Sequence, residues 1–143
     1  MKVTYYPGCS LEGTAVDYAA SITAMASFLN VGLVELLDWN CCGASSAHSL
    51  NHELALSLAA RNLVLAEKSQ RDLVAPCALC FNRLKAAEYA LRGPEGEKLG
   101  LPYRGEIKIW DLLDYLTQEI FLQELAAKVV RPLANLNCVG YYG

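Results

Sequence analysis

Positive charge is sparse in this sequence and is not concentrated anywhere along it. Lysine and arginine together number 12, against 15 aspartates and glutamates, and the formal net charge is −3 with an isoelectric point near 5.3. A nucleic-acid-binding domain presents basic side chains as a patch or a stripe. The scattered basic residues therefore predict that nucleic acid is not a partner.

Long apolar runs are also missing. Polar residues interrupt every apolar stretch well before eighteen residues, so no segment is predicted to span a membrane. The first eight residues lack the continuous apolar region of a secretory signal peptide. We therefore expect a cytoplasmic protein without direct membrane insertion. In that compartment, grouped cysteines more often bind metal or carry out redox chemistry than form structural disulfides.

The sequence is rich in apolar residues, arranged as alternating strands and helices. Of its 143 residues 54% are hydrophobic, enough for one domain with a real core. The predicted strands are Val3–Tyr6, Leu33–Leu37, Leu73–Ala75, Ile107–Trp110 and Leu136–Tyr142. Helices are predicted around 15–29, at Asn51–Ser69, from Cys77 to about 92 and over Leu112–Val130, with 93–105 as a loop. This alternation predicts the α/β class: a mainly parallel sheet with helices packed on both faces.

Five of the six cysteines form one pattern. Cys9 is single, Cys41 and Cys42 are adjacent, and Cys77 and Cys80 form a C-x-x-C pair. Each group follows the carboxyl end of a predicted strand. Open α/β sheets bind ligands at that edge, where the ends of parallel strands meet. We therefore expect the five cysteines to form a single site at the carboxyl edge of the sheet.

The number and spacing of these sulfurs favour an iron–sulfur cluster over a single metal ion. Five sulfurs are too many for one tetrahedral ion, and a structural zinc site would leave one of them spare. Adjacent residues such as Cys41 and Cys42 chelate one ion with strain, but they can bind two different metals of a cluster. The start of the helix at Cys77 stabilises thiolates through its partial positive charge. Cys138 stands apart and is predicted to be a small buried hydrophobe.

Three further residues near the cysteines are candidates for supporting roles. His48 and His52 follow the vicinal pair and could orient a substrate or carry protons. A hydrogen-bonded, partly exposed histidine near a helix start is the favoured interpretation of both. Trp39 either shields a cluster from water or packs at the end of its strand, and both interpretations stay open.

Three stretches around the cysteines carry a resemblance to a known family. They are Tyr5-Tyr6-Pro7-Gly8-Cys9, Asp38-Trp39-Asn40-Cys41-Cys42-Gly43-Ala44 with Ala47-His48, and Ala75-Pro76-Cys77-Ala78-Leu79-Cys80. They resemble the cysteine-rich CCG domain of the heterodisulfide reductase B subunit, and the resemblance covers essentially the whole chain. It implies that Cys9, Cys41, Cys42, Cys77 and Cys80 ligate a non-cubane [4Fe–4S] cluster.

The resemblance also implies an activity and partners. The B subunit of this family reduces the mixed disulfide of coenzyme M and coenzyme B by one-electron steps, as part of an oxidoreductase. Its electrons come through an A-like flavoprotein and a C-like iron–sulfur subunit. The wider family includes iron–sulfur subunits of lactate and glycolate oxidation, which remain an alternative. A zinc-bound or metal-free structural domain for subunit assembly is another, since the cluster is labile.

The family's B subunit contains two such domains in tandem. Residues 138–143, Cys-Val-Gly-Tyr-Tyr-Gly, echo residues 3–8, Val-Thr-Tyr-Tyr-Pro-Gly. We therefore expect residues 1–143 to form one CCG domain, with 134–143 as the start of a second repeat that is missing. Because the second CCG domain would be a partner in the site, the isolated fragment is expected to be inactive.

Overall fold

A parallel sheet of four strands organises the molecule, which a computed structural model describes for residues 1–44, 46–132 and 134–140. The strand order is β2-β1-β3-β4 and every pairing is parallel, so the predicted α/β class is confirmed. The strands are β1 (Lys2–Tyr5), β2 (Gly32–Glu35), β3 (Leu73–Ala75) and β4 (Ile109–Asp111).

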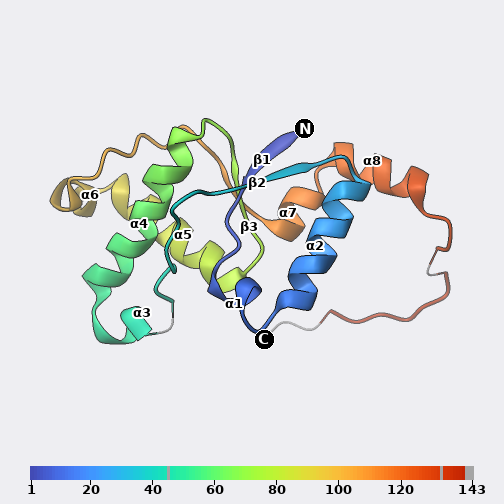
Figure 1. The fold of residues 1–143 in the computed structure, drawn as a ribbon, viewed down its shortest axis with the longest axis horizontal. Helices are drawn as coiled ribbons and strands as arrows, with labels where there is room; N and C mark the ends of the chain where they lie inside the picture. Colours follow the sequence, from blue (N-terminus) through green and yellow to red (C-terminus); the bar gives the residue numbers. More distant parts are fainter. Residues whose placement is uncertain (45, 133, 141–143) are drawn as a thin grey trace.

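Helices cover both faces of this sheet, as predicted. Figure 1 shows α4 and α5 on one side of the strands and α2, α7 and α8 on the other. The helices are α1 (Cys9–Glu12), α2 (Val16–Phe28), α3 (Ser46–Leu50), α4 (His52–Lys68), α5 (Ala78–Leu91), α6 (Pro94–Leu99), α7 (Leu112–Leu116) and α8 (Glu119–Lys128).

The alternation of side chains along the strands separates two hydrophobic cores. In β3, Leu73 and Ala75 face the core beneath α4 and α5, whereas Val74 faces the core beneath α2 and α7. All three residues are fully buried. A strand between two others in a parallel sheet is covered on both faces, which explains why this short segment contains apolar residues only.

The sequence of α4 predicts a leucine stripe of Leu54, Leu58 and Leu65, widened by Leu56 and Leu63, and the buried face differs from it. Leu54 is half exposed, and the fully buried positions belong mainly to alanines and to Leu63. Ala59 and Ala66 lie on this face, where α4 packs against α5. Small side chains let two helices approach closely, and hydrophobicity alone does not distinguish such a face from a leucine-rich one.

Short elements account for the remaining differences from the predicted boundaries. Neither α1 nor α3 was predicted, because four or five residues are too few to show a helical period. The predicted loop 93–105 contains α6, which starts with Pro94 at a position where its missing N–H costs nothing. The predicted helix Leu112–Val130 is divided into α7 and α8, and it ends at Lys128.

The segment after α8 does not form the strand predicted at Leu136–Tyr142. Residues 136–140 have no strand conformation and belong to none of the four strands of the sheet, while 141–143 lie outside the described residues. Cys138 is exposed, so its prediction as a buried hydrophobe is wrong. An apolar, β-rich sequence becomes a buried strand only where a sheet edge accepts it. Across the described residues, no helix has the length and hydropathy needed to cross a membrane.

Candidate metal centre

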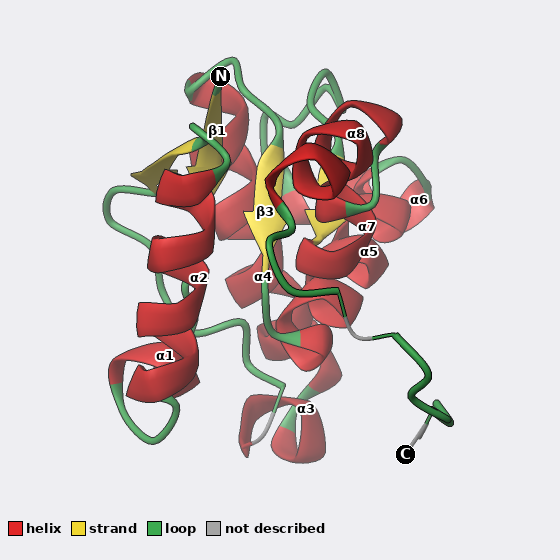
Figure 2. Cartoon of the chain, turned by 90° about the vertical axis from the view of Figure 1, so that its right-hand side faces the viewer, coloured by secondary structure: helices red, strands yellow, loops and turns green. Residues whose placement is uncertain are grey.

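Three strands deliver the five cysteines to the same edge of the sheet. Cys9 follows β1 and opens α1, Cys41 and Cys42 lie in the connection from β2 to α3, and Cys77 follows β3 and caps α5. In Figure 2, α1 and α3 both lie beyond the lower end of the strands. The parallel topology thus brings together cysteines that are more than thirty residues apart in sequence.

The sulfur atoms come together in pairs drawn from different connections. Cys9 Sγ lies 3.8 Å from Cys41 Sγ, and Cys42 Sγ lies 3.4 Å from Cys80 Sγ. Two thiolates bound at about 2.3 Å to one tetrahedral ion stand about 3.8 Å apart. The Cys9–Cys41 pair has this separation and the Cys42–Cys80 pair is closer, and the adjacent Cys41 and Cys42 belong to different pairs.

Cys77 completes the group at the first turn of α5. It is the N-cap residue of this helix, and Cys80 lies three residues further on, as the C-x-x-C spacing predicted. A hydrogen bond with Cys42, and then burial, raises the pKa of the Cys80 thiol, with Cys77 contributing as a neighbouring charge. The positive end of the 14-residue helix lies at these sulfurs, where it favours thiolates or an anionic ligand.

The two buried thiols, Cys42 and Cys80, share one proton. The hydrogen bond with Cys80 lowers the pKa of the Cys42 thiol to about 6, and the backbone N–H of Ala44 lowers it further. Burial acts in the opposite sense and dominates at Cys41, whose pKa is raised. Cys42 is therefore a thiolate at neutral pH even in the metal-free protein, which is the form that binds metal.

Glycines let the backbone pass close to these sulfurs. Gly8 has φ +72° and ψ 159°, a combination that only glycine adopts readily, and a Cβ there would lie 2.9 Å from Cys80 Sγ. Gly43, with φ +76°, directly follows the vicinal pair and packs against Ala55 and Leu58 of α4. Bulkier residues at either position would displace a cysteine or its neighbours.

The five thiols differ in their exposure to solvent. Cys42 and Cys80 are buried, Cys41 and Cys77 are half-buried, and Cys9 is exposed, so the group opens to solvent on one side. In the part of the chain that the structure describes, no three His, Cys, Asp or Glu side chains gather around one point. Four of the sulfurs are instead arranged as two separate pairs.

Tyr6 lies among the cysteines. This tyrosine was not predicted from the sequence to be part of the site. Its side chain is completely buried, and burial followed by the charges of Cys80, Cys42 and the other two nearby thiols raises its pKa. The ring contacts that of Trp39 edge to face, with the centroids 5.4 Å apart. Trp39 also donates a hydrogen bond to Glu35, so it packs at the end of β2 and covers the buried tyrosine.

The two histidines lie beside the site on the surface. Arg83 on α5 contacts His48, with 2.9 Å between Nη1 and Nδ1, and the rings of His48 and His52 are 6.4 Å apart. His48 is exposed and hydrogen-bonded, as the sequence indicated. Neither histidine joins the cysteines to form a metal-binding group in the described chain.

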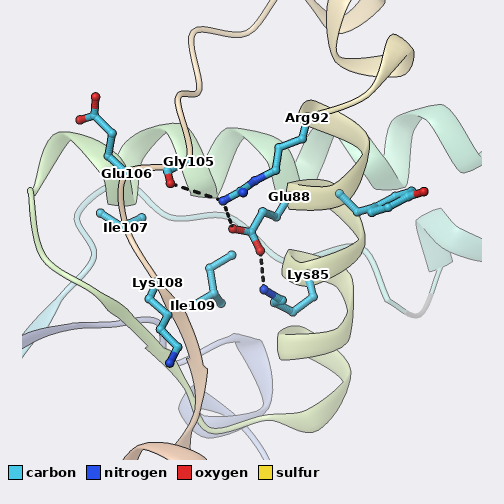
Figure 3. A pocket seen from close by; sticks show the side chains of 9 residues that line it. Lys85, Glu88, Arg92, Gly105, Glu106, Ile107, Lys108 and Ile109 are labelled. Atoms are coloured by element: carbon cyan, nitrogen blue, oxygen red, sulfur yellow. Dashed lines mark hydrogen bonds and ion pairs between the residues drawn. The ribbon is translucent and has the colours of Figure 1, made fainter.

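A separate hollow of about 530 Å³ lies between the second half of α5 and residues 105–109. Figure 3 shows the carboxylate of Glu88 at its centre, in ion pairs with Lys85 and, at 2.8 Å, with Arg92. Arg92 also contacts the backbone oxygen of Gly105. None of its lining residues is a cysteine, so this hollow is not part of the sulfur site.

Comparison with known families matches the part of the chain that contains the grouped cysteines. A model of the CCG family, described as a cysteine-rich domain, matches residues 3–85. That span contains all five grouped cysteines and excludes Cys138.

Related proteins include subunits of a fumarate reductase and of heterodisulfide reductases. The chain is 35% identical to the 8-methylmenaquinol:fumarate reductase membrane anchor subunit of Wolinella succinogenes, over 99% of this chain and 52% of that protein. It is 26% identical to the B subunit of the ferredoxin/F(420)H(2)-dependent CoB-CoM heterodisulfide reductase of Methanosarcina acetivorans, over 99% of this chain and 50% of that protein. A protein of Archaeoglobus profundus, described as like the heterodisulfide reductase B subunit, is 24% identical over 95% of this chain and 49% of that protein. The chain thus spans about half the length of these relatives.

Proposed function

The chain belongs to the CCG cysteine-rich domain family, and on that premise we propose that it is an iron–sulfur domain of an oxidoreductase subunit of the heterodisulfide reductase B type. The observation that carries the proposal is the convergence of thiols from three strand ends, four of them in pairs 3.4 and 3.8 Å apart and the fifth, Cys77, at the start of α5. The presence of heterodisulfide reductase subunits among its relatives supports the assignment.

The five cysteines would hold the cofactor, a non-cubane [4Fe–4S] cluster. Once bound, the cluster would supply one-electron redox chemistry. The chain contributes a preformed thiolate at Cys42, the positive end of α5 beside Cys77 and Cys80, and the space left by Gly8. The helix end compensates the negative charge of thiolate ligands, and Gly8 admits a bulky group close to the backbone.

The substrate in this proposal is a mixed disulfide of the coenzyme M–coenzyme B type. Its reduction to two thiols takes up two electrons and two protons. Because Cys9 is exposed while Cys42 and Cys80 are buried, a substrate would approach from the side of Cys9. A second CCG domain, an A-like flavoprotein and a C-like iron–sulfur subunit are the proposed partners, and this domain without them should not turn over.

Anaerobic iron and acid-labile sulfide analysis tests the cluster assignment. Wild-type protein, reconstituted and desalted without oxygen, should hold about four iron and about four sulfide per chain. Replacement of Cys42 by serine should lower both values, whereas Cys138→Ser, the matched control outside the group, should leave them unchanged. One zinc per chain with no sulfide would contradict the proposal.

A second candidate function is electron transfer in a respiratory oxidoreductase that does not act on a disulfide. The specific observation in its favour is the 35% identity to a fumarate reductase subunit, against 26% and 24% to heterodisulfide reductase proteins. The full-length parent protein, purified with its co-eluting subunits, separates the two. Disulfide-dependent oxidation of a reduced dye supports the first function, and quinol-dependent reduction of the cluster supports the second.

A further inference from the structure

A polar side chain occupies the centre of the buried face of α4. Asn62 is fully buried, although Ala59, Leu63 and Ala66 on the same face are apolar. Burial of an amide is unfavourable unless its donors and acceptor all find partners. The position of its partners therefore indicates what this residue does.

Both polar groups of the Asn62 side chain bind the backbone of one residue, Asn40. This residue lies in the connection from β2 to α3 that contains Cys41 and Cys42, called the cysteine loop below. Its Oδ1 accepts a hydrogen bond from the N–H of Asn40 at 3.0 Å, and its Nδ2 donates to the carbonyl of Asn40 at 2.8 Å. Asn40 immediately precedes Cys41 and Cys42. The amide thus holds this peptide by both of its hydrogen-bonding groups, as a neighbouring strand would.

Further contacts fix the same residue from other sides. The hydroxyl of Tyr6 donates to the carbonyl of Asn40 at 2.8 Å, which connects the loop to the end of β1. The Asn40 side chain donates to the carbonyls of Cys41, at 2.8 Å, and Leu58, at 3.0 Å. The backbone of the first vicinal cysteine is therefore also restrained.

Arg61, the neighbour of Asn62 on α4, holds the entrance to the loop. Its Nη1 donates to the Asn40 side chain at 2.9 Å and to the carbonyl of Asp38 at 2.6 Å. Its Nη2 forms an ion pair with the Asp38 carboxylate. Asp38 has φ +58°, a left-handed conformation that needs support in a residue other than glycine.

We infer that Asn62 is a positioning residue for the metal centre, acting through Asn40 on Cys41 and Cys42. This role rests on the proposed function, because it assigns Asn62 to the placement of cluster ligands. Cys41 pairs with Cys9, and Cys42 pairs with Cys80. A shift of the loop at Asn40 would therefore disturb both sulfur pairs at once, although no part of Asn62 is a ligand.

Two measurements on variants of α4 test the inference. In the holoprotein, anaerobic iron loss to a chelator should be about tenfold or more faster in Asn62→Leu, since residues that orient metal ligands change affinity by about 10–100-fold. In the metal-free protein, diamide takes two electrons and two protons from a thiol pair to form a disulfide. The yield of Cys42–Cys80 disulfide, mapped by mass spectrometry, should fall about tenfold because the sulfurs no longer meet.

Leu63→Ala is the matched control, since it removes buried apolar contact from the adjacent position of α4 but no hydrogen bond to the loop. It lowers stability, so it should change thermal unfolding while leaving iron loss and disulfide yield within about threefold of wild type. Asn62→Ala removes as many side-chain heavy atoms as Leu63→Ala does and introduces no bulkier group. It decides the question if Asn62→Leu fails to fold.

The two measurements distinguish a failure of this inference from a failure of the proposed function. Wild-type protein that takes up no cluster contradicts the proposed function, and the disulfide yield then still decides whether Asn62 positions the sulfurs. Asn62 variants that match Leu63→Ala in both measurements overturn the inference, because Asn62 would then be an ordinary structural residue.

Discussion

At the scale of single residues, the sulfur site depends on small and polar neighbours as much as on cysteine. Gly8 leaves room beside Cys80, and the proton shared by Cys42 and Cys80 keeps one thiolate available at neutral pH. Asn62 is buried because its amide satisfies the backbone of Asn40. Gly8 and Asn62 can be tested separately from the ligands.

Substitution of Gly8 by alanine should damage both the fold and the sulfur site. Its backbone conformation costs a residue with a side chain about 1–3 kcal/mol, and the added methyl would also press on Cys80 Sγ. Gly100→Ala is the control: φ is +58° and nothing lies within 4 Å, so only about 1–2 kcal/mol of backbone strain applies. Urea unfolding of the metal-free proteins should therefore show the larger loss for Gly8→Ala. Equal losses would show that Cys80 accommodates the methyl.

The stability of the metal-free protein should depend on pH through Cys42. Its pKa in the folded protein is about 6, below the usual 9.0, so its contribution is complete above pH 9 and is lost as the pH falls through about 6. The raised pKa of Cys80 opposes this only above pH 9, where the unfolded thiol ionises. Wild-type protein should gain free energy of unfolding relative to Cys42→Ser between pH 6 and 8.5, under reducing conditions. Cys138→Ser should follow the wild type, and parallel curves for Cys42→Ser would contradict the assignment.

The grouping of the cysteines could be predicted from sequence because it follows from topology alone. Pro7 and Pro76 mark the ends of apolar strands, and parallel strand ends meet at one edge. The division of the sulfurs into pairs was not predictable, and neither were the contacts of Asn62. Both depend on loop conformations that are fixed by partners more than twenty residues away.

At the scale of elements, helix α4 forms hydrogen bonds that stabilise two irregular segments. Its middle holds the cysteine loop through Arg61 and Asn62. Its last turn holds the connection from α6 to β4, since the Glu67 carboxylate accepts the backbone N–H groups of Arg104 and Glu106, each at 2.8 Å. The sequence predicted the extent of this helix to within one residue at each end, but it indicated leucines where the buried face consists mainly of alanines, Asn62 and Leu63.

Replacement of Glu67 by alanine should loosen the α6–β4 connection without affecting the sulfur site. Two backbone N–H groups lose a charged acceptor, and hydrogen bonds to charged groups contribute about 1.5–3 kcal/mol each when protected from water, less for these exposed ones. Amide hydrogen exchange should accelerate over residues 103–108, with iron binding unchanged. Glu124→Ala, an exposed glutamate of α8, should alter neither measurement. Unchanged exchange at 103–108 would show that other contacts hold this connection.

At the scale of the whole molecule, the two cores and the sulfur site are complete before residue 129. Phe121 is the buried residue of α8, and Lys128 at its end contacts the carbonyl and ring of Phe28 on α2. Beyond this point the described chain is exposed: Val130 is 90% and Val139 96% accessible. The fold class could be predicted because it depends on the order of elements, whereas the last predicted strand depended on a neighbour that the described sheet does not provide.

Removal of residues 131–143 should therefore leave both stability and metal binding almost unchanged. Substitutions and losses at exposed positions usually change the free energy of unfolding by about 0.5 kcal/mol or less, whereas Phe121→Ala, which empties a buried site in α8, should cost about 3–5 kcal/mol. Urea unfolding of the two variants should show this contrast, and the truncated protein should bind as much iron as the full chain because Cys138 lies outside the sulfur group. A loss above about 2 kcal/mol on truncation would mean that the segment packs against the domain. A loss of iron alone would instead assign Cys138 to the metal centre.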